Sequence, residues 1–423
     1  MQWKGWTLNA HARKSRPEPP ARHLHPADLH GAGRLLLLAA EVLVDQIDAL
    51  HLKLLGQSLE QPGSGGVTGF VYRRAKWSVT FTGRWLDSWA GAATGPRRST
   101  AQREAVLAAL NGVFGDLLER AGNPLAIPMR LRSGGKPVAM DRDALAALDG
   151  GEHAKLLILV HGLCRSDLQW RSANHDHGAA LARDLGYVPL YLHYNSGRHI
   201  SANGRDLAAL LDELVAHWPG HIGEIAILTH SMGGLVARSA CHYGEEAGHP
   251  WRAALRHLVF LGTPHHGAPL ERHGNWLTAV LGRSRATAPF ARLGRLRSAG
   301  ITDLRYGNLV DEDWHGLDRF HHAERLPRPL PLPKGVRCYT IAATTGSRLG
   351  DIRDRLLGDG LVPLDTALGR HPDPARTLAF PASHQWIGFG MHHLELLSRA
   401  EVYEQLRHWL APRTRRRKAL RQG

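Results

Sequence analysis

A serine stands where an apolar strand turns sharply into a helix. Residues 226–234 read Ala-Ile-Leu-Thr-His-Ser-Met-Gly-Gly, and a helical segment follows over 235–242. Such a nucleophile elbow lifts a serine hydroxyl out of the sheet and aims the next backbone N–H at a developing oxyanion. The pattern therefore predicts nucleophilic catalysis by Ser231, with the N–H of Met232 as an oxyanion donor. The usual motif has glycine two residues before the serine, where this chain has Thr229.

A serine hydroxyl is a poor nucleophile at neutral pH, so the elbow needs partners. It requires a base, a group that orients the base, and a second oxyanion donor. The apolar segment 156–160 runs directly into His161-Gly162-Leu163, upstream of the serine. Glycine lets the backbone turn there and approach a substrate closely. We expect the N–H of Leu163 to be the second donor of the oxyanion hole.

The orienting acid is expected after the serine in the chain. Asp359 lies in Leu-Gly-Asp-Gly-Leu-Val-Pro, residues 357–363, which follows the apolar segment 337–343. A turn of this kind presents a carboxylate at the end of a strand, and we assign the acid to Asp359. Three other aspartates are alternatives: Asp365, which is the nearest competitor, Asp351 and Asp354.

The base is expected last. A strand-like segment over 385–390 leads into Met-His-His, and a final helical segment follows over 394–410. His393 adjoins the start of that helix and is our choice, with His392 as the alternative. The chain has 28 histidines, so a histidine alone is weak evidence. Its place after Asp359 and before the last helix is what indicates a Ser231–Asp359–His393 triad.

The elements that would position these residues alternate between strands and helices. Apolar runs without polar alternation occur at 155–160, 188–192, 225–228, 257–261 and 337–343. Helical segments lie among them at 178–185, 203–218 and 235–242. Uniformly apolar strands that alternate with helices indicate an α/β fold with a mostly parallel sheet covered on both faces.

The chain divides by composition and periodicity. Residues 151–411 form the expected α/β domain, and its rhythm is broken at about 268–334, which we interpret as a cap-like insertion. Before it, 101–121 is the clearest helix, with Ser99 and Thr100 as cap candidates. The remaining predictions are a disordered basic N-terminus over 1–30, a helical N-terminal extension over 31–150 and a basic tail over 412–423.

Several of these motifs together resemble one family. Over about 155–410 the chain resembles the bacterial lipase and esterase group of the α/β-hydrolases, which is similar to GPI inositol-deacylases. The resemblance is carried by His-Gly-Leu-Cys (161–164), Tyr-Asn-Ser-Gly (194–197), Thr-His-Ser-Met-Gly-Gly (229–234), Leu-Gly-Thr-Pro-His-His-Gly (261–267), Asp-Gly-Leu-Val-Pro (359–363) and His-Leu-Glu-Leu-Leu (393–397). It implies an α/β-hydrolase fold and hydrolysis of a small-molecule or lipid carboxylic ester. The helical N-terminus also resembles the one that precedes this domain in some bacterial members.

Other functions stay open at this point. An acyltransferase would form the same acyl-enzyme and pass it to an alcohol. A non-catalytic membrane- or partner-binding protein could retain a vestigial hydrolase fold. The segment Asn-His-Asp-His, residues 174–177, contains metal-ligand types, but no second cluster has comparable spacing, so we expect a polar loop and neither metal nor cofactor.

Charge and cysteine content bear on partners and compartment. The net charge is +15, from 53 Lys and Arg against 38 Asp and Glu, with a basic run at 413–421. Such a run is typical of a solvated end, and an anionic membrane surface is a further candidate partner. No basic patch interleaved with aromatic residues is found, so no nucleic-acid partner is expected. Three distant cysteines and no signal-peptide core favour a cytoplasmic protein, with membrane association left open.

Overall fold

The described part of the chain covers most of the expected α/β domain. The computed structural model describes residues 27–28, 30–35, 99–148, 150–172, 174–268, 298–317, 326–348 and 358–412. The predictions for 1–26, for most of the extension before 99, for most of the cap-like insertion and for the tail after 412 lie outside these residues. The domain boundaries therefore stay predictions.

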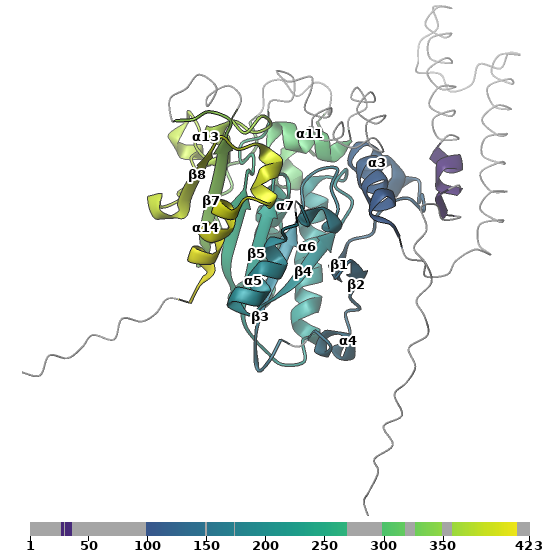
Figure 1. Cartoon of the computed structure of the whole chain (residues 1–423). Helices are drawn as coiled ribbons and strands as arrows, with labels where there is room; N and C mark the ends of the chain where they lie inside the picture. Colours follow the sequence, from purple (N-terminus) through teal and green to yellow (C-terminus); the bar gives the residue numbers. More distant parts are fainter. Residues whose placement is uncertain are drawn as a thin grey trace, which may run out of the picture.

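One eight-stranded sheet organises the described residues (Figure 1). Its order is β2-β1-β4-β3-β5-β6-β7-β8. The strands are β1 (Arg130–Ser133), β2 (Lys136–Pro137), β3 (His153–Val160), β4 (Tyr187–His193), β5 (His221–His230), β6 (Leu255–Leu261), β7 (Arg337–Thr344) and β8 (Gln385–Phe389). β1 is antiparallel to both of its neighbours, and the pairs from β4 to β8 are all parallel.

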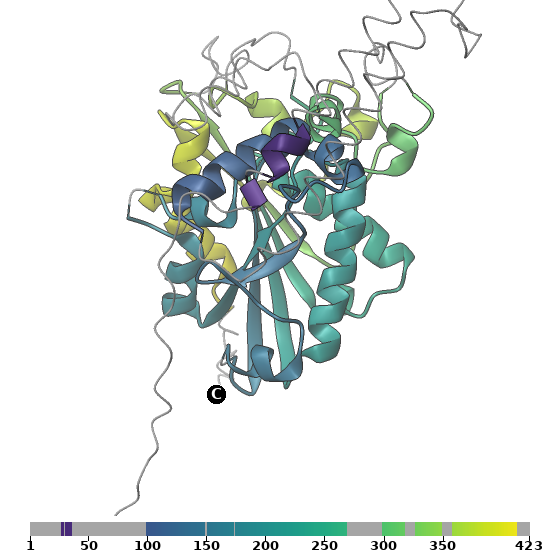
Figure 2. The ribbon, with the colours of Figure 1, turned by 90° about the vertical axis from the view of Figure 1, so that its right-hand side faces the viewer.

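Helices cover both faces of this sheet (Figures 1 and 2). Among the described residues, the labelled α-helices are α3 (Ala101–Arg120), α4 (Arg142–Ala146), α5 (His177–Leu185), α6 (Ile200–His217), α7 (Gly233–Glu246), α8 (Trp251–Ala254), α11 (Ala299–Tyr306), α13 (Leu364–Ala367) and α14 (Ala400–Leu410), and residues 27–28 and 30–35 are helical as well. The 3-10 turns are η1 (Asp167–Trp170), η2 (Asp311–Asp313), η3 (Pro374–Arg376), η4 (Ala382–His384) and η5 (His393–Leu397).

The central strands are apolar throughout because both of their faces are buried. On β3, Leu156 and Ile158 join the core cluster that contains residues of α6 and α7. Their neighbours Leu157 and Leu159 join the opposite cluster, which contains residues of α5 and α14. Successive strand residues point to opposite faces, so each face needs its own apolar set. The predicted α/β fold, a mostly parallel sheet covered by helices on both faces, is confirmed.

Two local predictions need correction. The first strands of the sheet, β1 and β2, fall inside the segment assigned to a helical extension, because strands of four and two residues show no periodicity. The final helix predicted over 394–410 is a 3-10 turn, η5, followed by α14. By contrast, α3 begins as predicted, and the hydroxyl of its N-cap Thr100 accepts the N–H of Arg103 at 3.3 Å.

Candidate active site

Ser231 occupies the turn between β5 and α7. Its φ is 55°, in the left-handed region that costs a non-glycine residue energy and often marks a functional turn. The turn is held from both sides: the N–H of Ser231 donates to the Leu261 carbonyl at 2.8 Å. Its own carbonyl accepts the hydroxyl of Thr263 at 3.0 Å. The strand-to-helix turn predicted at this serine is therefore present.

Thr229, which stands where the usual motif has glycine, is accommodated within the sheet. Its side chain is fully buried, and its hydroxyl donates to the carbonyl of Val259 on β6 at 3.0 Å. A buried hydroxyl costs free energy unless it is hydrogen-bonded. Because this one has a partner, the threonine fits without leaving an unsatisfied group under the elbow.

Asp359 and His393 are joined directly. Oδ2 of Asp359 lies 2.6 Å from Nδ1 of His393, and both side chains are buried. The other carboxylate oxygen accepts the N–H groups of Leu361 at 3.0 Å and Val362 at 2.8 Å. The backbone N–H of His393 also donates to the backbone carbonyl of Asp359 at 3.1 Å. A carboxylate accepts from Nδ1–H, so Nε2 of His393 is left as the basic nitrogen.

His393 and Ser231 lie at the same edge of the sheet. A Cβ on Gly262, which has φ of 57°, would lie 3.0 Å from Nδ1 of His393, and Gly262 directly follows the partner of the Ser231 N–H. The ring of His230, next to the serine, is 4.6 Å from the His393 ring. No hydrogen bond between the Ser231 hydroxyl and the His393 imidazole is formed among the described residues. Such catalytic bonds commonly tighten only when substrate is bound.

The alternative acid and base lie elsewhere. His392 is exposed, and its N–H donates to Oε2 of Glu395 at 2.8 Å as the cap of η5. The Asp365 side chain is 64% exposed and lies 3.5 Å from Arg370. The geometry therefore favours Asp359 and His393 over this pair. Asp351 and Asp354 lie outside the described residues.

The two expected oxyanion donors are available. The backbone N–H groups of Leu163 and Met232 donate to no other residue in the described ranges. A Cβ on Gly162 would lie 2.9 Å from Cβ of Ser231, so this loop packs directly on the serine and tolerates only glycine at that position. We define residues 161–170 as the oxyanion loop, because they follow β3 and carry Leu163.

Tyr194 holds the start of the oxyanion loop. Its hydroxyl donates to the His161 carbonyl at 2.8 Å, and its ring stacks on the His161 ring at 4.3 Å. Nδ1 of His161 lies 2.9 Å from the Gly162 carbonyl and donates to it. Burial lowers the pKa of His161 to about 3, so the imidazole stays neutral at neutral pH.

Two residues that contact His393 or the oxyanion loop, His230 and Tyr194, have no clear signal in the sequence. His230 is buried, its Nε2 lies 3.2 Å from the His393 carbonyl, and burial followed by the charge of His393 lowers its pKa well below the usual range. In the sequence it is one more residue at the end of a strand. Tyr194 belongs to a motif of the resembling family, but nothing local connects it to His161.

The other reactive side chains near the site are inert or structural. Burial raises the pKa of the Cys164 thiol to about 12, so this cysteine does not compete as a nucleophile. In the segment 174–177, Nε2 of His175 lies 2.8 Å from Nδ1 of His177, whose Nε2 lies 2.9 Å from the Leu396 carbonyl. That segment joins α5 to η5.

Two hollows flank these elements. A small one, next to Gly162 and His230 but not lined by Ser231 itself, is lined by His161, Gly162, Arg165, Ser166, Gln169, Trp170, His230 and Leu397. A larger one of about 650 Å³ lies beside α7, between the segments 326–338 and 371–384, and contains none of the expected catalytic residues. The small hollow is therefore the one next to the expected chemistry.

Comparisons with known proteins give distant similarities. The model of a family described as a domain of unknown function (DUF7379) matches residues 131–289, which is less than half of the chain. No curated protein matches.

The similar solved structures include lipases and esterases. The mature lipase BlEst2 of Bacillus licheniformis is 18% identical, with a TM-score of 0.36, over 60% of this chain and 90% of that chain. The Pyrococcus furiosus esterase Pf2001 is 16% identical, with a TM-score of 0.37, over 62% and 82%. Aspergillus fumigatus lipase B is 13% identical, with a TM-score of 0.37, over 63% and 57%.

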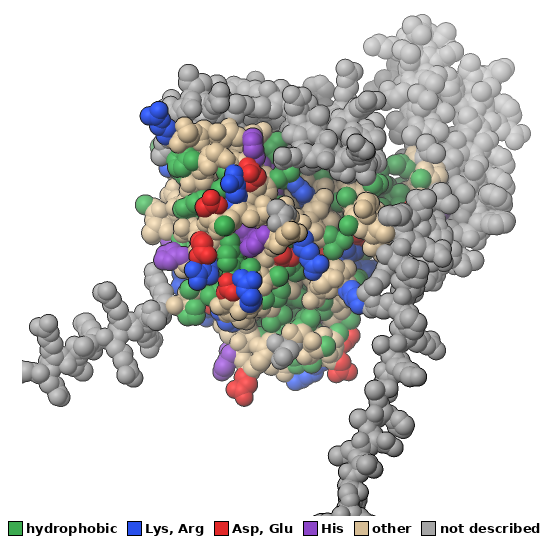
Figure 3. Space-filling view, in the orientation of Figure 1, with side chains coloured by type: hydrophobic (Ala, Val, Ile, Leu, Met, Phe, Trp, Pro, Cys, Tyr) green, Lys and Arg blue, Asp and Glu red, His purple; other side chains and the backbone are tan. Residues whose placement is uncertain are grey.

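The length and apolar character of the helices, and the distribution of charge on the surface, bear on membrane association. Among the described helices, none combines the length and apolar character needed to cross a bilayer. On the face shown in Figure 3, basic and acidic side chains are interspersed among apolar and polar ones. The described part of this face does not gather positive charge into one patch.

Proposed function

We propose that the protein is a serine hydrolase that cleaves carboxylic esters through Ser231, His393 and Asp359. The observation that supports this most is the short bond between Asp359 and Nδ1 of His393, at the same sheet edge as a serine in a left-handed turn. A carboxylate, an imidazole and a serine hydroxyl in this order match the roles that ester hydrolysis needs. We further propose that, among such esterases, it is similar to GPI inositol-deacylase-like enzymes.

In the acylation half of the reaction, Nε2 of His393 takes the hydroxyl proton of Ser231 as its oxygen attacks the ester carbon. The carbonyl oxygen becomes an oxyanion and accepts the N–H groups of Leu163 and Met232. Asp359 keeps the imidazole in the required tautomer and stabilises the imidazolium. His393 then protonates the leaving alcohol, the carbon–oxygen bond breaks, and an ester of Ser231 remains.

In the second half, a water molecule enters where the alcohol left. His393 removes a proton from this water, whose oxygen attacks the acyl carbon, and the oxyanion forms in the same place. The imidazolium returns the proton to Ser231 as the acid is released. An alcohol in place of water would give acyl transfer, and product analysis with added alcohol separates the two reactions.

A fluorophosphonate probe tests the nucleophile, because it phosphonylates activated serines. The folded wild-type chain is expected to take up one probe molecule, and Ser231→Ala is expected to take up none. Ser398→Ala, at a partly exposed serine remote from the elbow in the chain, is the matched control and should label like the wild type. Labelling that persists unchanged in Ser231→Ala would rule out Ser231 as the nucleophile.

A further inference from the structure

Helix α3 lies across the carboxyl edge of the sheet and packs on the oxyanion loop (Figure 2). A Cβ on Gly112 would lie 2.2 Å from Sγ of Cys164 and 3.0 Å from its Cα and N. Contacts below 3.0 Å do not occur without movement, so the helix and the loop are in backbone contact here. Cys164 is the residue directly after Leu163, the expected oxyanion donor.

Cys164 itself is held in an unusual conformation. Its φ is 58°, in the left-handed region, and its N–H donates to the hydroxyl of Ser196 at 3.0 Å. A non-glycine residue keeps such a φ only when its surroundings determine it. Gly112 on one side and Ser196 on the other supply those surroundings.

Ser196 belongs to the loop after β4, and α3 fixes this loop too. Nδ2 of Asn195 donates to the Gly115 carbonyl at 2.9 Å, and a Cβ on Gly115 would lie 1.8 Å from Oδ1 of Asn195. A Cβ on Gly197 would lie 2.1 Å from the Asn111 carbonyl. The oxyanion loop, which contains Cys164, and the loop after β4 therefore both pack on α3.

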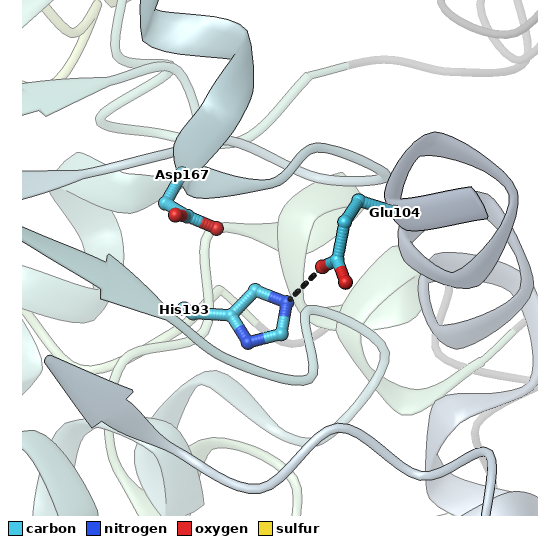
Figure 4. A group of neighbouring side chains, drawn as sticks. All are labelled: Glu104, Asp167 and His193. Carbon is cyan, nitrogen blue, oxygen red and sulfur yellow. Dashed lines mark ion pairs between the residues drawn. The ribbon is translucent and has the colours of Figure 1, made fainter. Parts of the chain in front are cut away.

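A buried charged cluster fixes the far end of the oxyanion loop to the same helix. Figure 4 shows Glu104 of α3, Asp167 of η1 and His193 of β4 converging. Oε2 of Glu104 lies 3.2 Å from Nε2 of His193. Nη1 of Arg132, on β1, lies 3.1 Å from the same oxygen and 3.0 Å from Oδ1 of Asp167. The cluster thus connects the start of α3 to Asp167 in the loop.

These side chains are of types that bind metal ions, but the cation position is filled by the protein. The Arg132 guanidinium contacts one oxygen of each carboxylate, so it supplies the positive charge that the two acids require. We therefore interpret the cluster as an ionic connection between elements and not as a metal centre.

We propose that α3 is the positioning element of the oxyanion hole, acting through Gly112 at Cys164 and through Glu104, by way of Arg132, at Asp167. The two attachment points, Cys164 and Asp167, lie on either side of the loop segment 165–166, and Cys164 directly follows Leu163 in the chain. They fix the direction of the Leu163 N–H without contacting substrate. This inference rests on the proposed function only for its effect on rate; the fixing of the loop is measurable without activity.

The first test is Gly112→Ala, which places a methyl group against Cys164. Amide hydrogen exchange of peptides spanning 161–170 is expected to become several-fold faster, while exchange in β5 and β6 stays as in the wild type. If the wild type hydrolyses p-nitrophenyl esters, kcat should fall about tenfold or more, with KM little changed. The upper limit of this fall is the ~10²–10³-fold loss that follows complete removal of an oxyanion donor.

The matched control is Gly244→Ala in α7. A Cβ there would lie 2.6 Å from Cζ2 of Trp251, so it strains a buried helix comparably but touches no part of the oxyanion loop. It should leave loop exchange and the ratio of kcat to KM unchanged. Cys164→Ala combined with Gly112→Ala removes the clashing sulfur and should restore most of the lost rate.

Glu104→Gln is the second variant, and it keeps the inference falsifiable if Gly112→Ala does not fold. It should accelerate exchange mainly in peptides that contain Asp167. Unchanged loop exchange in the folded variants, or equal effects from Gly244→Ala, would overturn the role of α3. If the wild type is inert to fluorophosphonate while loop exchange still responds to these variants, the proposed function fails and the positioning by α3 stands.

Discussion

At the scale of single residues, both carboxylate oxygens of Asp359 have hydrogen-bond partners. One carboxylate oxygen accepts two backbone N–H groups, and the other meets Nδ1 of His393. This arrangement holds the carboxylate in one rotamer and leaves the imidazole one tautomer. The loop 358–363, which carries Asp359, therefore sets the orientation of the buried His393 imidazole.

Asp359→Asn is expected to lower kcat by about 10³–10⁴-fold with little change in fold, because an amide can donate to Nδ1 and so stabilise the wrong tautomer. Steady-state hydrolysis of a p-nitrophenyl ester measures this, with circular dichroism as the check on folding. Asp365→Asn, at an exposed aspartate paired with Arg370, is the control and should keep the wild-type rate. Equal rates for the wild type and Asp359→Asn would assign the acid elsewhere.

The chain order of residues in the expected site could be read from the sequence, because each follows an apolar strand of a parallel sheet. This order is what predicts Ser231, Asp359 and His393. The choice between His392 and His393 was not decided by periodicity, and the structure separates them by burial: His392 is exposed and His393 is not.

At the scale of elements, the buried cluster of Glu104, Arg132, Asp167 and His193 was not predicted. Its members come from α3, β1, η1 and β4, and each looks like a charged residue at the edge of an element when read alone. Local periodicity reports which face of an element is apolar. It carries no information on which charged residues of different elements meet, so only the folded chain reveals this cluster.

This cluster should make stability depend on pH in the acid range. Burial raises the pKa of Glu104, but the contact with His193 and the charge of Arg132 outweigh it and hold the pKa at about 2, against an ordinary value of 4.5. A lowered pKa stabilises the folded chain above about pH 4.5, and this contribution is lost as the pH falls toward about 2. Burial raises the pKa of the neighbouring Asp167, which acts in the opposite direction.

Glu104→Gln should therefore have a lower free energy of unfolding than the wild type at pH 6 to 7. The two free energies should converge as the pH falls toward about 2. Urea unfolding at a series of pH values measures both proteins. Glu119→Gln, at an exposed glutamate of the same helix that pairs with Arg198, controls for the loss of one negative charge and one exposed ion pair. A difference between wild type and Glu104→Gln that grows at low pH would contradict the assignment of this pKa.

At the scale of the whole molecule, the parallel sheet brings distant residues together. The carboxyl ends of β3, β5, β6 and β7 point to one edge, so the segments that follow them lie side by side there. The oxyanion loop, the turn at Ser231, Gly262 and the loop with Asp359 all belong to these segments or follow them. α3 precedes the sheet in the chain and packs on the oxyanion loop at this edge. In our proposal, part of the sequence before the sheet therefore positions the site.

The fold class was readable from the sequence because strands buried on both faces leave uniformly apolar runs. The short antiparallel strands β1 and β2 leave no such run, and they were missed. The contact of α3 with the oxyanion loop was also missed, since it depends on Gly112, and a glycine in a helix usually reads as a weakness of that helix.

The most direct measurement is to trap the acyl-enzyme. The wild-type chain is mixed briefly with a p-nitrophenyl ester, quenched in acid, weighed by mass spectrometry and digested to locate the adduct. We expect one added acyl group on the peptide that contains Ser231, with the adduct absent in Ser231→Ala and forming more slowly in Asp359→Asn. Ester turnover with no adduct at Ser231, or an adduct at another residue that survives Ser231→Ala, would contradict the proposed mechanism.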